Sequence, residues 1–188
     1  MTLTPARARK SKNRPTIDQL RVAARHVDEL LAVGATENLA IRILEDYVDI
    51  YATMHHGGSV PPYRAHRVAL WSAAACKIRS ENPSAKPRDH FVVEHGTPRR
   101  AFARLVLELS RKGELNEQSM NDLAQRYWKV AVVTREEDDR LNKVARFTMY
   151  DTPEERWDAA GIVFATDIDA PSQSASTIAP PSAIPKAT

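Results

Sequence analysis

The sequence predicts a mainly helical α+β domain with about five to six amphipathic helices and a small two- or three-stranded sheet. Two observations support this fold class. Apolar residues recur every three or four positions over most of residues 16–165, which is the period of an amphipathic helix. Two short runs, 91–95 and 129–133, are instead rich in valine and are typical of strands.

The two ends of the chain have compositions typical of disordered segments. Residues 1–15 carry five Lys/Arg and no acid, which predicts a disordered basic arm. Residues 166–188 are rich in Pro, Ala and Ser, and such a segment buries too little apolar surface to offset the loss of chain entropy. We therefore predict a single globular domain, 16–165, between a disordered arm and a disordered tail.

Three helices are predicted before residue 80. The first is capped by Thr16 and stopped by Gly34, with Ile17, Leu20, Ala24, Val27 and Leu31 on its apolar face. The second begins at Thr36 and ends near Met54, before Gly57 and Gly58, with Leu39, Ile43, Val48 and Tyr51 on its apolar face. The third is expected from about Tyr63 to Arg79, with Val68, Trp71, Ala75 and Ile78 facing inward.

Strands and helices alternate in the second half of the domain. FVVEH, residues 91–95, is a predicted strand, followed by a helix with Thr97 as N-cap, Pro98 as its first residue and Gly113 as its stop. A further helix is expected over roughly 117–127. KVAVV, residues 129–133, is the second strand, and Thr134 with Glu137 fits a capping box.

RWDAAGIVF, residues 156–164, predicts a short helix and a third extended piece. A long helical segment separates the two strands, so a parallel and an antiparallel pairing are both compatible with the sequence.

Composition favours a soluble cytoplasmic protein without a membrane partner. The chain is 43% hydrophobic and 27% charged, and no run approaches the roughly 18 apolar residues that span a bilayer. Cys76 is the only cysteine, which excludes an internal disulfide and is typical of a reducing compartment. We expect Cys76 to be a small buried residue.

The net charge of +3 is unevenly distributed. Of the 27 Lys/Arg, five lie in the arm and one in the tail, and of the 24 acids two lie in the tail, which leaves the domain with 21 bases and 22 acids. Residues 64–112 hold eleven Lys/Arg and four acids, whereas residues 135–158 hold eight acids and five bases. This layout predicts either a basic surface for an anionic partner or two segments that neutralise each other.

Glu94 and His95 are the candidate catalytic residues. A carboxylate that takes a 2′-hydroxyl proton, an imidazole that protonates the leaving oxygen and a nearby arginine are the groups of metal-independent RNA cleavage. Neighbouring residues of a regular strand, however, point to opposite faces. The pair can converge only if the strand breaks at His95, which Gly96 permits; otherwise these residues simply end a strand before a capped helix.

The helix that follows offers candidate nucleic-acid or anion-binding residues. Arg99 and Arg100 lie in its first turn, where the backbone N–H groups and the helix dipole attract anions. We add Arg64, Arg67 and Arg104 to this set. The expected partner is a DNA or RNA backbone, bound in a salt-dependent manner and without predicted sequence specificity.

Four consecutive acids, residues 136–139, open a predicted helix. They would spread around the helix axis, so they predict no two-metal site, but they could form an acidic surface for a protein partner. No P-loop, GxGxxG, CxxC or GxSxG sequence is present, and we expect neither a metal nor a cofactor.

These patterns predict a non-enzymatic nucleic-acid-associated protein that binds phosphate backbones through a basic face and the N-terminal arm. One alternative is a protein-interaction module, such as an inhibitor or adaptor of a nucleic-acid enzyme. A second alternative is a small metal-independent ribonuclease that uses Glu94 and His95.

Overall fold

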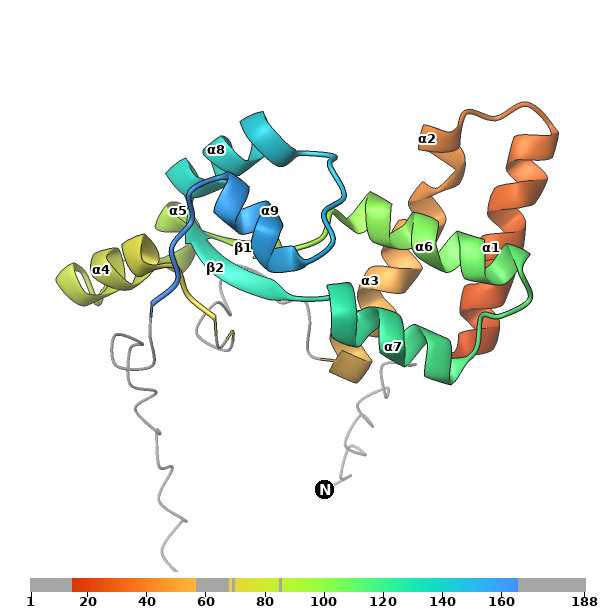
Figure 1. Cartoon of the computed structure of the whole chain (residues 1–188), viewed down its shortest axis with the longest axis horizontal. Helices are drawn as coiled ribbons and strands as arrows, with labels where there is room; N and C mark the ends of the chain where they lie inside the picture. The colour runs from red at the N-terminus through yellow and green to blue at the C-terminus, as the bar shows by residue number, and fades with distance from the viewer. Residues whose placement is uncertain (1–14, 57–67, 69, 85, 166–188) are drawn as a thin grey trace, which may run out of the picture.

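The computed structural model describes residues 15–56, 68, 70–84 and 86–165, and it is mainly helical with one two-stranded sheet, as predicted. Figure 1 shows two lobes. The helical lobe contains α1 (Ile17–Ala32), α2 (Glu37–Ala40), α3 (Arg42–His56), α6 (Arg99–Arg111) and α7 (Glu117–Tyr127). The sheet lobe contains β1 (Phe91–His95), β2 (Val130–Thr134), α4 (Ala73–Glu81), α5 (Pro87–His90), α8 (Arg135–Ala145) and α9 (Pro153–Ala159).

Each lobe has its own buried apolar side chains. The helical lobe packs α1, α3, α6 and α7 around residues such as Leu20, Val27, Leu44, Phe102 and Met120, all 0% exposed. The sheet buries Phe91 and Val132 against Trp71 on one face and Val133 against Trp157 on the other. The two strands therefore have apolar contacts on both faces, which explains their valine-rich sequences. Cys76 is buried, as expected.

The strands pair antiparallel, which resolves the question that the sequence left open. The register runs from Phe91 opposite Thr134 to His95 opposite Val130. The predicted third extended piece is present as a single bridge between Phe164 and Ser72. The arm, the tail and most of the loop after α3 lie outside the described residues.

The helix caps follow the sequence closely. Thr16 forms a capping box with Gln19, and Thr134 forms one with Glu137. Gly34 and Gly113 follow the ends of α1 and α6 with φ values of +89° and +73°, a backbone region that favours glycine.

The predicted helix 63–79 is wrong at residues 70–72, which the structure describes as non-helical. Trp71 and Ser72 are extended and bridge to Val132 and Phe164, and the helix starts only at Ala73, with Ser72 as its N-cap. The reason is a competing set of backbone bonds: the Ser72 N–H donates to the Val132 carbonyl at 2.9 Å, and the Val132 N–H donates to the Leu70 carbonyl at 2.9 Å. Residues 63–67 lie outside the described part of the chain.

The N-cap predicted for α6 and two residues predicted for the core differ in the structure. Pro98, not Thr97, is the N-cap of α6, and Thr97 is buried at 3% exposure just before it. Leu39 and Ile43 are 61% and 42% exposed and do not belong to the core face assigned to them. The turn at Ile41 separates α2 from α3, and Ile41 itself is fully buried.

Candidate functional site

Glu94 and His95 point to opposite sides of β1. The Glu94 carboxylate accepts a hydrogen bond from Arg156 of α9 at 3.0 Å, within the sheet lobe. The His95 Nε2 lies 3.5 Å from the Asp49 carboxylate of α3, on the side of the helical lobe. The strand stays paired through His95, so the break that convergence requires does not occur. This geometry does not bring the two candidate catalytic groups together.

Arg156 holds the sheet lobe together around Glu94. Its side chain is only 2% exposed, and it donates to the carbonyls of Ala145 and His95 at 3.0 and 2.6 Å as well as to Glu94. These bonds join α9 to the end of α8 and to β1. A buried guanidinium with three acceptors is a satisfied structural charge.

Asp138 faces the same cluster. Burial raises the pKa of its carboxyl, and the nearby Glu94 and Asp139 raise it further, while Arg156 and a hydrogen bond from Asn142 act in the opposite direction. Ionisation of Asp138 is therefore less favourable in the folded protein than in the unfolded chain.

We expect Asp138→Asn to stabilise the protein at pH 7 by roughly 0.5 kcal/mol, a typical value for a partly exposed charge contact. Because folding raises this pKa, the carboxyl stabilises the fold only at low pH and loses that contribution as the pH rises through the folded-state value. The advantage of the variant should therefore shrink towards about pH 4. Urea unfolding at both pH values measures it, and an equal difference at the two would contradict this assignment.

His95 belongs to a junction between the lobes. Its imidazole is 14% exposed and packs edge-on against Trp128, with ring centroids 4.8 Å apart. The Asp49 carboxylate lies between this imidazole and the Arg99 guanidinium, each 3.5 Å away. Through these contacts His95 connects the end of β1 with Asp49 of α3 and with Trp128 at the end of α7.

The α6 arginines of the predicted anion-binding set face acids of α2 and α3. Arg99 lies 2.9 Å from Asp46, and Arg104 lies 2.6 Å from Glu37. Arg100 has two partners, a Glu45 oxygen at 2.5 Å and the Asn38 side-chain oxygen at 2.8 Å. A phosphate would have to compete with these contacts.

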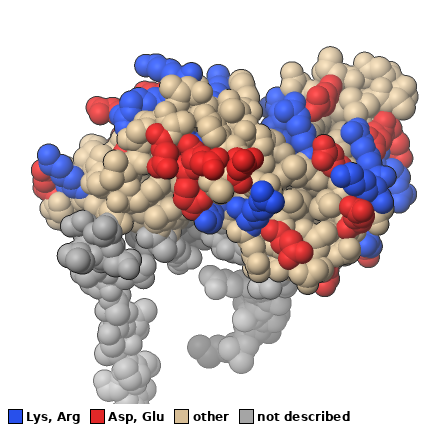
Figure 2. Space-filling view, in the orientation of Figure 1, with Lys and Arg blue, Asp and Glu red and all other residues tan. Residues whose placement is uncertain are grey.

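The other predicted arginines, Arg64 and Arg67, lie outside the described residues. On the face shown in Figure 2, basic and acidic side chains are interspersed over the helical lobe and do not gather into one basic surface. The acids that contact Arg99, Arg100 and Arg104 lie at residues 37–46 and not in the acidic segment 135–158, so these contacts do not show the predicted neutralisation of one segment by the other.

The acidic run at the start of α8 does not form a four-residue surface. Glu137 is 3% exposed and accepts hydrogen bonds from the Ser72 hydroxyl at 2.6 Å and from the Thr134 N–H at 2.8 Å. Asp138 is half-buried, which leaves Glu136 and Asp139 exposed. Among the described residues, no group of three or more His, Cys, Asp or Glu is arranged to hold a metal ion.

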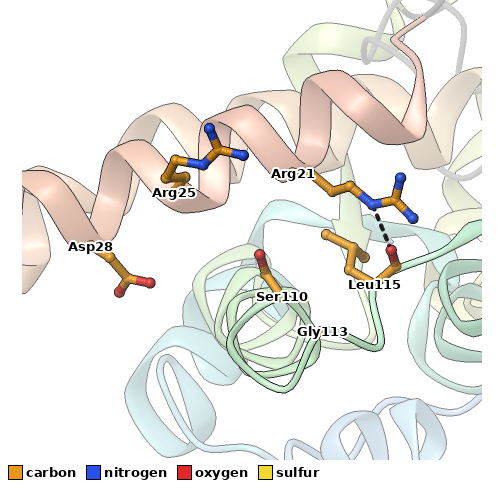
Figure 3. A pocket seen from close by; sticks show the side chains of 6 residues that line it. All are labelled: Arg21, Arg25, Asp28, Ser110, Gly113 and Leu115. Atoms are coloured by element: carbon orange, nitrogen blue, oxygen red, sulfur yellow. Dashed lines mark hydrogen bonds between the residues drawn. The ribbon is translucent and has the colours of Figure 1, made fainter.

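A cavity of about 290 Å³ lies between α1 and the turn that follows α6 (Figure 3). Arg21, Arg25 and Asp28 of α1 contribute to its lining together with Ser110 and Gly113, and the Arg21 Nε donates to the Leu115 carbonyl at 2.8 Å. Arg25 forms no ion pair with another residue of the described ranges. The cavity adjoins the C-terminal end of α6, where the helix dipole disfavours anions.

α3 has a second apolar face, which was not predicted from the sequence. Ile43, Tyr47 and Ile50 are 42%, 38% and 48% exposed, and Met54 is partly exposed one turn further on. The side chains at 43, 47, 50 and 54 are spaced by four, three and four residues, so they form one stripe that we call the outer face of α3. The core uses a different stripe, Leu44, Val48, Tyr51 and Ala52.

The outer face of α3 continues into a groove beside α1. This groove has a volume of about 290 Å³, and its apolar lining comes from Val22 and Ala23 of α1 and from Ile43 and Tyr47 of α3. Val22 is 61% exposed. Exposed apolar side chains that adjoin along two helices are typical of an interaction surface, unlike single exposed apolar residues.

Comparisons of the chain with protein-family models, with curated proteins and with solved structures find no match. None of the helices in the described ranges has the length and apolar character needed to cross a membrane.

Proposed function

We propose that this chain is a non-enzymatic protein-interaction module that docks a protein on the outer face of α3 and the adjoining groove. The observation that carries the proposal is that α3 is apolar on two sides, of which the core covers only one. An exposed apolar stripe that continues along a helix beyond its contact with the core is typical of an interaction surface. An aromatic residue among aliphatic ones, here Tyr47, is also the composition of interface centres.

The charges support a protein partner over a phosphate backbone at this lobe. Arg99, Arg100 and Arg104 already contact acids or an amide within the chain, so binding a phosphate there would break those contacts. The outer face itself presents no arginine or lysine among residues 43, 47, 50 and 54. Partner binding at this face should accordingly depend weakly on salt.

Replacing Ile50 by glutamate is expected to weaken partner binding, because it places a charge in the apolar stripe. The fold should stay intact, because residue 50 is 48% exposed in the free protein. The matched control is Val144→Glu, at a position of α8 that is 54% exposed. A protein captured by the full chain should, once purified, bind the wild type and the control alike and bind Ile50→Glu at least about tenfold more weakly. Equal affinity for all three would rule out this face.

Nucleic-acid association through the arm is the second candidate function. It is supported by the five bases and no acid in residues 1–15. A gel shift with DNA and RNA at two salt concentrations tests it against a chain that begins at residue 15. A salt-sensitive shift that the shortened chain loses would assign nucleic-acid binding to the arm, and together with partner capture it would describe an adaptor. A shift that the shortened chain retains, or no shift, would contradict it.

A further inference from the structure

We propose that the C-terminal end of α8, with the residues directly after it, binds a single strand of nucleic acid. Arg140, Lys143 and Arg146 contact its phosphates, and Phe147 stacks on one of its bases. This site lies on the folded domain and is distinct from the N-terminal arm. It does not depend on the outer face of α3, which belongs to the other lobe (Figure 1).

Three bases at this end of α8 have no acidic partner within the described ranges. Arg140, Lys143 and Arg146 are exposed and form no ion pair there, unlike the arginines of α6. Arg140 donates to the neutral carbonyl of Ala160 at 3.3 Å, which leaves its charge uncompensated. The three positions span about 9 Å at 1.5 Å per residue. Their charges outweigh the roughly half negative charge at the end of a helix, so this end of α8 attracts anions.

Phe147 adds a stacking surface beside these bases. It is 67% exposed, and the guanidinium carbon of Arg146 lies over its ring, 5.1 Å from the centroid. Proteins that bind single strands combine cations along the backbone with exposed aromatic rings on which bases stack, and arginine adds cation–π contacts. An exposed ring among unpaired cations therefore fits a single strand.

The acids of α8 favour a narrow anionic ligand over a broad one. Glu136 and Asp139 are exposed on the N-terminal half of the helix, whereas the three bases lie towards its C-terminal end. An anionic membrane surface that lies along the whole helix would meet both halves, and the two acids would be repelled. A single strand can follow the basic end alone. A duplex fits less well, because its paired and stacked bases cannot reach Phe147.

Fluorescence anisotropy of labelled single-stranded DNA and RNA oligonucleotides with the full chain tests the site. The double variant Lys143→Gln with Arg146→Gln should bind at least about tenfold more weakly. Its slope of log affinity against log salt should be shallower by about 1.4, because two phosphate contacts at about 0.7 each are lost. Phe147→Ala should also weaken binding by about tenfold but leave the salt slope unchanged, because stacking releases no counterions.

The matched control is Lys112→Gln with Arg126→Gln. It removes the same net charge from exposed residues at the ends of α6 and α7. Arg126 also lies over an aromatic ring, that of Tyr127 at 4.9 Å, but Tyr127 is less exposed than Phe147. The control should bind both oligonucleotides within about twofold of the wild type. Circular dichroism checks that each variant is folded.

A wild type that binds neither oligonucleotide would overturn the inference, as would equal weakening in the control and in the α8 double variant. Wild-type affinity of Phe147→Ala would also overturn it. So would binding to anionic lipid vesicles or to poly-glutamate, but not to oligonucleotides, which would assign the surface to a lipid or an acidic protein. Protein capture by the outer face of α3 is measured with Ile50→Glu, so the proposed function and this site can fail separately.

Discussion

Replacing Arg156 by methionine is expected to lower the free energy of unfolding by about 3–5 kcal/mol. Arg156 is 2% exposed, and its removal leaves the Glu94 carboxylate and two backbone carbonyls without their donor. Methionine fills much of the volume but supplies no hydrogen bond, and an unpaired buried acceptor costs its full desolvation. Chemical denaturation of the variant measures the loss.

The matched control is Arg140→Met. Arg140 also donates to a backbone carbonyl, that of Ala160, but at 3.3 Å and from an exposed side chain, so its replacement should cost less than about 1 kcal/mol. The double variant Glu94→Gln with Arg156→Met should recover part of the lost free energy of unfolding, because it also removes the Glu94 charge that Arg156→Met leaves unpaired. Similar losses for the two arginines would contradict the role given to Arg156.

Replacing Gly96 by alanine is expected to destabilise the protein by about 3 kcal/mol, at the upper end of ordinary overpacking. A Cβ at this position would lie 2.3 Å from the Cβ of Pro153 and 3.0 Å from a ring carbon of Trp157. Pro153 is held at the start of α9 and Trp157 is fully buried, so neither can move away easily. Gly96 thus lets β1 end directly against α9.

Gly34→Ala separates this clash from backbone strain. Gly34 has a φ of +89°, but nothing lies within 4 Å of the position that a Cβ would occupy. Its replacement should therefore cost only the strain, about 1 kcal/mol. Thermal or urea unfolding of the two variants compares them, and equal losses would mean that the contact with Pro153 is relieved by a small backbone shift.

Local features of the fold could be read from the sequence, whereas contacts between distant segments could not. The caps at Thr16 and Thr134 and the strand at 91–95 depend on residues within a few positions, and all three are confirmed. The extended backbone at Trp71 depends on Val132, some sixty residues later, and its apolar spacing resembles a helix. Strand direction was undetermined for the same reason.

In the candidate site, too, local features could be predicted from the sequence and contacts between distant residues could not. That Glu94 and His95 face opposite ways follows from the alternation of a strand and could be anticipated. The contact between Arg100 and Glu45, 55 residues apart, could not be anticipated from the sequence. The α6 arginines were therefore predicted to be available for an anion.

The outer face of α3 was missed because two apolar stripes with the same period lie on one helix. Ile43, Val48 and Tyr51 were assigned to a single face, but Val48 and Tyr51 are buried and Ile43 is exposed. The four-three-four spacing from residue 43 to residue 54 was the available signal.

Site-specific photo-crosslinking gives the clearest decision on the docking face. A photoreactive amino acid placed at position 50 of the full chain, with position 144 as the control, reports which protein lies against each site in the cells that express it. We predict protein adducts from position 50 and none from position 144. Adducts from neither position, or equally from both, would contradict a docking role for the outer face of α3.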